Sequence, residues 1–288
     1  SINGTAAVGN TLSIIEESAD PDGSGTLTYS WQTSSESSSW SEVGTSTTYT
    51  VGASDEGKLI KAVIIYKDDQ GFDETVTTSS SSIPLVDDGV AEFSISGTAE
   101  VGETLSISED TADADGTGDL TYSWQTSSDN STWSVVGTDS TYTVGASDEG
   151  KSIRAIISYQ DDQGFDETVT TSSSSIPYVD DGDASFSISG TAEVGETLSI
   201  SEDSADADGT GTLSYSWQTS SDNSTWSVVG TNATYTVGAS EDGKSIKAVI
   251  SYQDDQGFNE TVTTASSSIP YVDDGVAEFS LSGTAEVG

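Results

Sequence analysis

Apolar and polar residues alternate along most of this chain. Between residues 93 and 176 the alternation falls in seven short runs, beginning with Phe93 and Ile95 and then Leu105 and Ile107. A period of two residues predicts β-strands, and Ser and Thr at the intervening positions fit the solvated face of antiparallel sheets. No segment has the apolar stripe of a helix. The predicted strands are 93–96, 104–108, 120–126, 133–136, 141–144, 152–159 and 167–176.

The whole pattern repeats along the chain. The string Gly-Thr-Ala begins at Gly4, Gly97, Gly190 and Gly283, at a constant spacing of 93 residues. Copies two and three, counted from Gly97 and Gly190, differ at 14 of 93 positions. A period of this length is typical of a whole small domain and is too long for a solenoid repeat. The sequence therefore predicts domains at 1–89, 90–182 and 183–275, followed at 276–288 by the first strand of a fourth copy.

Seven short strands per copy favour an all-β fold of tandem immunoglobulin-like β-sandwiches. Trp124 lies in the middle of the third predicted strand, where such sandwiches place a core Trp, and Trp31 and Trp217 hold the same position in the other copies. The chain contains no Cys, so packing alone must hold the two sheets together. Three such domains end to end are expected to form an elongated rod, on the order of 120 Å from the rise of a strand and its loops.

Four short motifs carry a resemblance to a known group of proteins. They are DxDGxG, Tyr-x-Trp, Asp-x-Gly-Lys and Asp-x-Gln-Gly. Each recurs from copy to copy, except that Glu241 replaces the Asp of Asp-x-Gly-Lys in copy three. With these motifs the chain resembles the tandem Ig-like repeats of giant bacterial secreted and surface adhesins, including proteins with hemolysin-type calcium-binding regions. The resemblance implies a secreted or cell-surface location and a role as an extender, which holds a terminal binding domain away from the cell.

Composition excludes several classes of function. The chain has 49 acidic and 7 basic residues, and its net charge of −42 repels phosphate backbones and anionic lipids. We therefore expect neither nucleic-acid binding nor insertion into a membrane. Without Cys or His there is no thiolate or imidazole metal site and no Ser-His or Cys-His pair. Paired carboxylates recur in every copy on turn-rich loops, which is unlike a catalytic site, so no enzyme activity is expected.

The acidic residues gather at loops and linkers. In each copy one group lies between the second and third strands, one between the sixth and seventh, and one in the linker that follows. We predict that these groups meet where domains join and bind calcium, a hard cation that takes 6–8 oxygen ligands. The predicted ligands are Asp20, Asp22, Asp68, Asp69, Asp87, Asp88, Asp113, Asp115, Asp161, Asp162, Asp180, Asp181, Asp206, Asp208, Asp254 and Asp255. Asp55, Glu56 and Asp148, from the turn before the sixth strand, are expected to join them.

The acidic motif has a simpler alternative reading. Counted from Asp113, the loop begins like an EF-hand, but its twelfth position is Trp124 and not the Glu which that loop requires. Asp and Gly are also ordinary turn residues, so a solvated, salt-tolerant acidic surface without a specific site remains open.

Two other functions also remain open at this stage. The partners expected for an extender are the neighbouring repeats of the same chain. A second hypothesis is a self-assembling filament or matrix, in which residues 280–288 add to the sheet of another subunit. A third is a carbohydrate- or ice-binding module, which would need a flat or grooved site.

Overall fold

The computed structural model describes residues 1–273 and 275–283, and in this part of the chain every regular element is a β-strand or a single short 3-10 turn per copy. Copy two shows the pattern. Its elements are β9 (Glu92–Ser96), β10 (Thr104–Thr111), β11 (Thr121–Ser127), β12 (Ser134–Gly137), β13 (Thr141–Thr143), η2 (Ala146–Asp148), β14 (Ser152–Gln160), β15 (Asp166–Thr170) and β16 (Ser174–Ser175).

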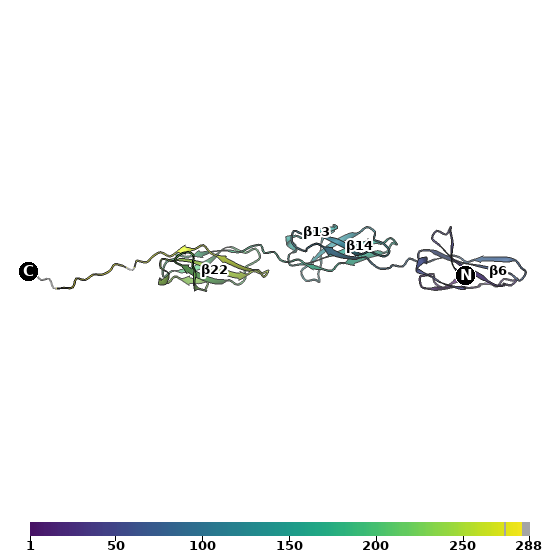
Figure 1. Cartoon of the computed structure of the whole chain (residues 1–288), viewed down its shortest axis with the longest axis horizontal. Helices are drawn as coiled ribbons and strands as arrows, with labels where there is room; N and C mark the ends of the chain where they lie inside the picture. The colour runs from purple at the N-terminus through teal and green to yellow at the C-terminus, as the bar shows by residue number, and fades with distance from the viewer. Residues whose placement is uncertain (274, 284–288) are drawn as a thin grey trace, which may run out of the picture. The chain divides into compact units, whose positions relative to one another are not determined.

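Copies one and three repeat this order. The elements of copy one are β1 (Ile2–Asn3), β2 (Thr11–Ile14), β3 (Thr28–Ser34), β4 (Ser41–Gly44), β5 (Thr48–Thr50), η1 (Ala53–Asp55), β6 (Leu59–Lys67), β7 (Asp73–Thr77) and β8 (Ser81–Ser82). Those of copy three are β17 (Ser185–Ser189), β18 (Thr197–Ser204), β19 (Ser214–Ser220), β20 (Ser227–Gly230), β21 (Thr234–Thr236), η3 (Ala239–Glu241), β22 (Ser245–Gln253), β23 (Asn259–Thr263) and β24 (Ser267–Ser268). The strands β6, β14 and β22, labelled in Figure 1, hold the same position in the sheet order of the three copies.

Each copy is a pair of antiparallel sheets. In copy two the first sheet has the order β13-β10-β9 and the second β12-β11-β14-β15, with β16 also paired to β14. In immunoglobulin letters these are strands E, B and A against C′, C, F and G. The B–C loop therefore connects β10 to β11, the E–F turn connects β13 to β14, and the F–G loop connects β14 to β15. The prediction of an all-β fold built from sandwich units is therefore confirmed.

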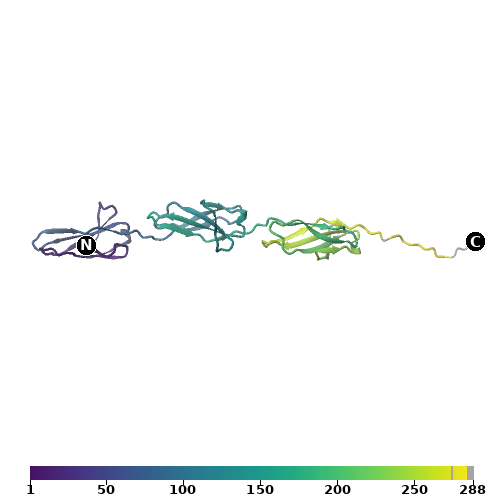
Figure 2. The same ribbon diagram turned by 180° about the vertical axis from the view of Figure 1, so that it is seen from behind.

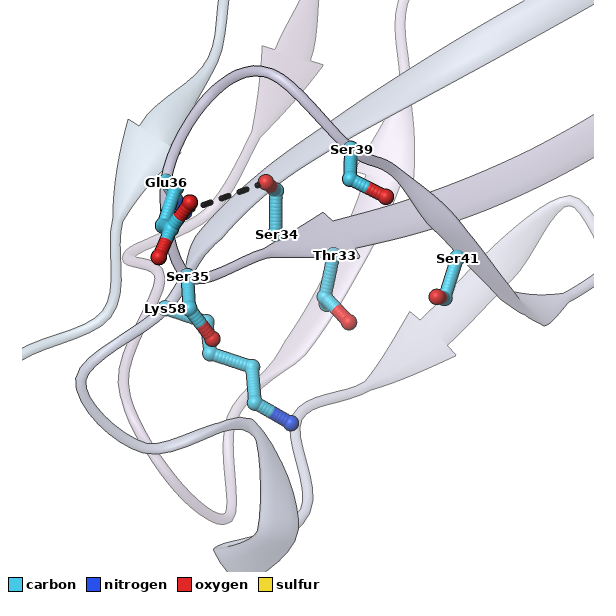
Figure 3. A pocket seen from close by; sticks show the side chains of 7 residues that line it. All are labelled: Thr33, Ser34, Ser35, Glu36, Ser39, Ser41 and Lys58. Atoms are coloured by element: carbon cyan, nitrogen blue, oxygen red, sulfur yellow. Dashed lines mark hydrogen bonds between the residues drawn. The ribbon is translucent and has the colours of Figure 1, made fainter.

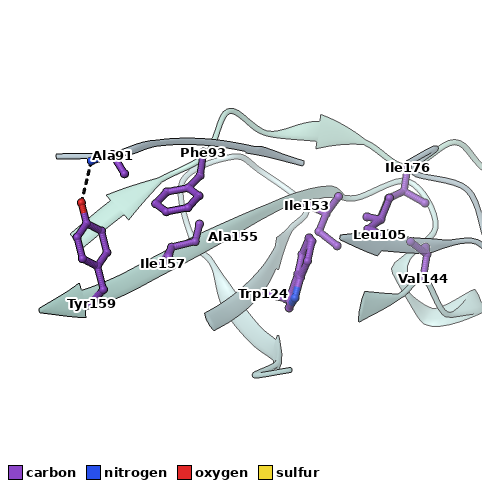
Figure 4. Packing of buried hydrophobic residues seen from close by; sticks show 10 residues of the cluster. All are labelled: Ala91, Phe93, Leu105, Trp124, Val144, Ile153, Ala155, Ile157, Tyr159 and Ile176. Atoms are coloured by element: carbon purple, nitrogen blue, oxygen red, sulfur yellow. Dashed lines mark hydrogen bonds between the residues drawn. The ribbon is translucent and has the colours of Figure 1, made fainter. Parts of the chain in front are cut away.

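A buried Trp lies at the centre of each core. Trp124 of β11 is fully buried and pairs in register with Ala155 of β14. Its indole N–H donates to the carbonyl oxygen of Asp139 (3.0 Å), so the one polar atom of the ring is satisfied. Phe93 of β9 and Ala91, which directly precedes that strand, pack from the other side of the sandwich onto β14, where Phe93 meets Tyr159 edge to face (Figure 4). Each copy has a separate core of this kind.

The predicted strand 167–176 is interrupted in the structure. Strand β15 ends at Thr170 and β16 begins at Ser174. Between them the backbone N–H of Thr171 donates to the carbonyl oxygen of Ala155, and the N–H of Ala155 donates to the Thr171 hydroxyl (3.0 Å each). The hydroxyl thus replaces a main-chain carbonyl, which lets the strand bend without leaving a buried N–H unsatisfied.

The described residues form two compact units, Ser1–Ile176 with copies one and two and Pro177–Gly288 with copy three. Residues 276–283 belong to the second unit but lie in no strand, and both views show them running away from its sandwich (Figures 1 and 2). The last predicted positions, 284–288, and Asp274 lie outside the described residues. Within the described chain no helix is long and apolar enough to cross a membrane.

Candidate functional site

The B–C loop of copy two is folded around its two Asp residues. The backbone N–H of Asp115 donates to Oδ1 of Asp113 (2.9 Å), which closes a tight Asx turn. Gly116 follows with a φ of +92°, and a Cβ there would lie 2.5 Å from Oδ2 of Asp162. Glycine therefore permits both the turn and the close approach of the F–G loop.

The F–G loop brings a second set of oxygens to the same place. Oδ1 of Asp161 accepts the backbone N–H groups of Gln163 (2.9 Å) and Phe165 (2.8 Å). The side-chain amide of Gln163 donates to Oδ1 of Asp115 (2.5 Å), which joins this loop to the B–C loop. Oδ2 of Asp161 and Oε1 of Gln163 are buried and have no hydrogen-bond donor. The loop pair thus holds more buried acceptors than its own donors can satisfy.

The linker from copy one is bound to the same two loops. The backbone N–H of Asp88 donates to Oδ2 of Asp115 (2.9 Å). Three residues later the N–H of Ala91 donates to the hydroxyl of Tyr159 (2.7 Å), and that hydroxyl donates to Oδ2 of Asp113 (2.7 Å). Burial raises the pKa of Tyr159 to about 12, so the phenol keeps its proton and remains a donor. The carboxylates of the B–C loop therefore organise the entry of the linker into the sandwich.

Copy three repeats this arrangement within its own unit. The N–H of Asp181 donates to Oδ2 of Asp208 (2.8 Å), and Ala184 N–H donates to the hydroxyl of Tyr252 (2.8 Å). Tyr252 in turn donates to Oδ2 of Asp206 (2.7 Å). Oε1 of Gln256 is another buried acceptor without a donor. The site is thus a property of the repeated sequence and not of one copy.

A buried Glu completes the cluster, and the sequence analysis missed it. Glu167 on β15 is buried, and burial followed by the negative charge of Asp87 raises the pKa of its carboxyl above the ordinary value. Asp113 and Asp161 add to this effect. The available signal was the period of two, which places residue 167 on the inward face with Phe165 and Val169.

Copy three has one more carboxylate than copy two at this position. Asp183 stands where copy two has Val90, and its hydrogen bond to Glu260 is the main cause that raises the Glu260 pKa to about 7. Burial and the charge of Asp180 contribute further. Glu260 therefore keeps its proton more readily than an ordinary carboxyl, because two neighbouring negative charges are costly.

The predicted ligands of copy one form the same loop pair with fewer contacts. Tyr66 donates to Oδ2 of Asp20 (2.7 Å), and the side chain of Gln70 donates to Oδ1 of Asp22 (2.9 Å). Lys67 forms an exposed ion pair with Asp73 (2.8 Å) beside this F–G loop. Copies two and three have Gln160 and Gln253 at the Lys67 position, so their F–G loops contain no basic residue.

The acids of the E–F turn are bonded within their own copy. Asp148 is buried, and its Oδ2 accepts the Tyr142 hydroxyl (2.5 Å) and the N–H of Gly145 (3.0 Å). Asp55 has the corresponding bonds in copy one. In both copies one carboxylate oxygen is thus bonded to the preceding strand and to the turn itself. Glu56 does reach the linker, where Oε1 accepts the N–H of Val86 (2.6 Å).

The structure brings the remaining predicted residues together in three loop pairs. In copy two Asp113, Asp115, Asp161 and the linker Asp88 are joined by the bonds given above. Asp162 lies beside Gly116, and Oδ1 of Asp87 accepts the N–H of Gly89 (2.9 Å). The equivalents in the other copies hold the same positions: Asp68 and Asp69 in copy one, and Asp180, Asp254 and Asp255 in copy three.

The donor set fits a hard cation. Every potential ligand is a carboxylate or amide oxygen, which suits calcium and not zinc or copper. Across residues 1–273 and 275–283, no three acidic side chains converge closely enough to hold a metal ion as they stand. Binding would therefore require the exposed Asp side chains to turn toward the unsatisfied oxygens of Asp161 and Gln163.

Two other features of the surface are less informative. A shallow recess of about 280 Å³ near the end of β3 is lined by hydroxyls, with Lys58 and Glu36 as its charged residues (Figure 3). Trp133 carries a cation over its ring, since the guanidinium carbon of Arg154 lies 4.1 Å from the ring centre. Lys61 over Trp40 and Lys247 over Trp226 repeat this stack in the other copies.

No protein-family model and no curated protein sequence matches this chain. Among solved structures, it is similar to a Ca²⁺-stabilized adhesin that helps an Antarctic bacterium reach out and bind ice (14% identity, 90% of this chain and 68% of that chain, TM-score 0.32). It is also similar to a tetra-tandem repeat in the extending region of a large adhesion protein (15%, 87% and 68%, 0.33) and to the D1–D4 ectodomain fragment of ICAM-5 (12%, 94% and 75%, 0.39). Similarity at this level identifies no family, so function has to be argued from the chain's own residues.

Proposed function

We propose that this chain is a series of non-catalytic extender repeats from a large extracellular bacterial surface protein, stiffened by calcium at the acidic end of each sandwich. The observation that carries the proposal is the excess of buried oxygen acceptors where the linker enters. In copy two, Asp161 is only 5% exposed, yet one of its carboxylate oxygens has no donor. A buried charge without a partner is costly, and a bound cation would satisfy it.

The candidate ligands of copy two come from three segments besides the F–G loop. The linker contributes Asp87 and Asp88, the B–C loop Asp113 and Asp115, and the start of β15 Glu167. Two carboxylates 4 Å apart repel each other by about 1 kcal/mol in water and by more where solvent is excluded. A divalent cation would replace this repulsion with attraction and tie the linker to both loops. The candidate ligands in copy three are Asp180, Asp181, Asp206, Asp208, Asp254, Asp255 and Glu260, and those in copy one are Asp20, Asp22, Asp68 and Asp69.

The extender role is supported by what repeats and by where the charge lies. Repeated sandwiches, with equivalent linker contacts at copies two and three, form a modular chain whose length is set by the number of copies. The acidic side chains lie on the loops at one end of each module, so a cation bound there would restrict the angle between the module and the linker that precedes it. An acidic outer surface also keeps such a chain soluble and apart from other anionic surfaces.

Calorimetric titration of the whole chain with calcium tests the site. We expect two tight sites, at copies two and three, because only their described linkers donate to the B–C loop. Asp161→Asn removes one charge but keeps the acceptor for the Gln163 and Phe165 N–H groups, and it should abolish one of the two sites.

Asp166→Asn is the matched control for this variant. Asp166 is an exposed acid at the start of β15, directly after the F–G loop that contains Asp161, so its loss changes the net charge equally without touching the cluster. If both variants weaken binding alike, the chain attracts calcium only through its general charge. A chain that binds no calcium at all would refute the site.

Small-angle scattering with and without a chelator tests the stiffening. The maximum dimension and the melting temperature should both fall when calcium is removed from the intact chain, and Asp161→Asn should reproduce part of this change. Unchanged values in chelator would leave an extender that does not use calcium.

A further inference from the structure

The hydroxyl-lined recess at the end of β3 is uninformative about calcium, but it recurs with the same chemistry in copy two. Its volume is about 280 Å³ in copy one and about 270 Å³ in copy two. We propose that this recess binds a neutral hexose unit of a glycan, so that each repeat carries a weak sugar-binding site. In copy two it lies at the end of β11, whereas the acidic B–C loop lies at the start of that strand. The proposal therefore depends neither on calcium nor on the extender role.

The lining of the recess is equivalent in the copies. In copy two it consists of five hydroxyl side chains, the carboxylate of Asp129 and the ammonium group of Lys151. Copy one again has five hydroxyls, together with Glu36 and Lys58, and Figure 3 shows these side chains bordering one open space. Copy three has the same residue types as copy two at all seven positions. The recess is thus a property of the repeat, as the acidic loop pair is.

Two groups in the recess are available to bind a molecule. Thr126 is only 3% exposed and lines the recess, and its hydroxyl forms no hydrogen bond within residues 1–273 and 275–283. Lys151 has neither an ion pair nor a hydrogen bond at its ammonium group in the same part of the chain, although the protein has 49 acidic residues. A buried hydroxyl and a charged ammonium group both gain free energy when a ligand supplies the missing partner.

The carboxylate of the recess is fixed in position. Oδ1 of Asp129 accepts the N–H groups of Thr132 (2.7 Å) and Ser131 (2.8 Å). It also accepts the hydroxyl of Ser127 (3.0 Å). The backbone bonds and then the side-chain bonds hold the pKa of Asp129 well below its ordinary value, so the group stays ionised. These three bonds all use Oδ1, which leaves Oδ2 to accept from a ligand, and Asp222 has the same bonds in copy three.

The opposite rim of the recess is held by a stacked pair. Trp133 lies in the chain between two lining residues, Thr132 and Ser134. Arg154 stacks over the Trp133 ring, and its Nε and Nη2 both donate to Oε1 of Gln125 (3.0 and 2.9 Å). Strands β11 and β14 thus hold the rim in place before any ligand arrives. Such preorganisation lowers the entropic cost of binding.

The mixture of charges in the recess favours a neutral polyol over an ion. The carboxylate of Asp129 repels an anion, and the ammonium group of Lys151 repels a cation. The hydroxyls of a sugar both donate and accept, so one can donate to Asp129 while its neighbour accepts from Lys151 or Thr126. The volume lies just below the range of about 300–1,000 Å³ that is usual for small-molecule sites, so the recess suits one sugar ring and not a longer oligosaccharide.

The copies should differ in their affinity for a sugar. Nζ of Lys58 in copy one donates to the carbonyl oxygen of Ser54 (2.6 Å), a bond that a ligand has to replace. Lys151 and Lys244 have no such bond in the described chain, so copies two and three should bind more tightly than copy one. Several weak sites on one chain act together on a surface that displays many sugar units.

Nuclear magnetic resonance of the full, isotope-labelled chain in chelator tests the proposal. The probes are the methyl glycosides of glucose, galactose and mannose, each titrated into the millimolar range. At least one should shift the amide resonances of the recess, such as those of Ser128 and Lys151, in a saturable way. The shifts should be half-complete at a lower sugar concentration in copies two and three than in copy one.

Two variants test the assigned groups in copy two. Thr126→Val removes the buried hydroxyl at nearly the same shape and should weaken binding about fivefold, the effect of one hydrogen bond. Lys151→Met acts at the rim and should weaken binding at least about tenfold, because hydrogen bonds from charged groups are stronger. Thr170→Val is the control, since Thr170 is an exposed residue of β15 outside the recess, and it should leave binding unchanged. In each variant the unaltered copies one and three should still bind.

The proposal fails if none of the three glycosides shifts the recess resonances, or if both recess variants bind as the unaltered chain does. It also fails if glucuronate or inorganic phosphate binds the recess and the neutral glycosides do not, because the recess would then be an anion site. Calcium is absent throughout, so the sugar site and the calcium site tested by Asp161→Asn can each fail without the other.

Discussion

The two ends of one sandwich use the same chemical pair in different ways. At the E–F end of copy two, Tyr142 donates to Asp148, and at the B–C end Tyr159 donates to Asp113. Asp148 also receives the N–H of Gly145 and has no other acid bonded to its turn. Asp113 belongs to a cluster in which the neighbouring Asp161 lacks a donor for one oxygen.

The difference is in the balance between donors and acceptors. At the E–F end Oδ2 of Asp148 accepts both the Tyr142 hydroxyl and the N–H of Gly145, so the carboxylate works as an internal hydrogen-bond cap. At the B–C end the carboxylates exceed the donors, and the pKa of Glu167 is raised by burial and by its acidic neighbours. The two ends teach that an acidic residue in this fold indicates a ligand only where acceptors are left over.

The largest expected effect comes from removing the tyrosine hydroxyl that donates to a carboxylate at each end of the sandwich. Tyr159→Phe should destabilise copy two by about 3 kcal/mol, since it leaves a buried N–H at Ala91 and one Asp113 oxygen unpaired. Tyr142→Phe should cost about 1.5 kcal/mol, because the N–H of Gly145 still donates to Asp148. Denaturant dependence of hydrogen exchange in copy two measures both. Equal costs would contradict the stronger coupling assigned to the B–C end.

Calcium should stabilise the B–C end by a similar free energy and leave the E–F end nearly unchanged. At one hundred times the dissociation constant, a ligand that binds only the folded state adds about 2.7 kcal/mol. We expect the B–C and F–G loops and the linker to gain protection from exchange, while the E–F turn around Asp148 changes little. The same measurement with magnesium is the control for general ionic effects. Uniform protection across the copy would argue against a localised site.

A smaller effect concerns pH in the absence of calcium. The pKa of Glu260 is raised to about 7 from an ordinary 4.5, so between these values the folded protein holds a proton that the unfolded chain releases. The stability of copy three in chelator should therefore fall as pH rises across this interval. Calcium affinity should rise over the same interval, because the ion requires the ionised carboxylates.

Asp183→Val is the matched variant for this pH dependence, since copy two has Val90 at that position. It removes the main cause of the raised pKa and should flatten the pH dependence of copy three. Thermal unfolding in chelator at a series of pH values measures it. If the variant keeps the full pH dependence, Asp183 is not the cause of the raised pKa of Glu260.

The smallest expected effect is at Lys67, the last residue of β6, where the F–G loop of copy one begins. Lys67→Gln gives copy one the residue of copies two and three and removes the exposed ion pair with Asp73. Exposed pairs contribute little, so stability should change by no more than about 0.5 kcal/mol. Calcium binding to copy one should nevertheless strengthen in a titration, because a positive charge has left the loop. A large loss of stability would show that the Lys67–Asp73 ion pair stabilises copy one by more than an ordinary exposed pair.

The sequence by itself determined the architecture. The period of two, the spacing of 93 residues and the position of Trp124 depend on local chain geometry and burial, and these leave a pattern in any single copy. The grouping of the loop acids was also readable, because Asp113, Asp115, Asp161 and Asp162 lie on loops that the topology brings to one end.

Only the tertiary structure decided which carboxylates keep an oxygen without a hydrogen-bond donor and are therefore candidate ligands. Asp148 and Asp113 each accept one N–H of their own turn and one tyrosine hydroxyl. Tyr142 is only 6 residues from Asp148 in the chain, whereas Tyr159 is 46 residues from Asp113. Glu167 could be placed on an inward face, but its charged neighbours come from the linker and two loops. Hydrogen-bond satisfaction depends on atoms far apart in the chain, and for that reason sequence alone could locate the acids but not separate structural carboxylates from candidate ligands.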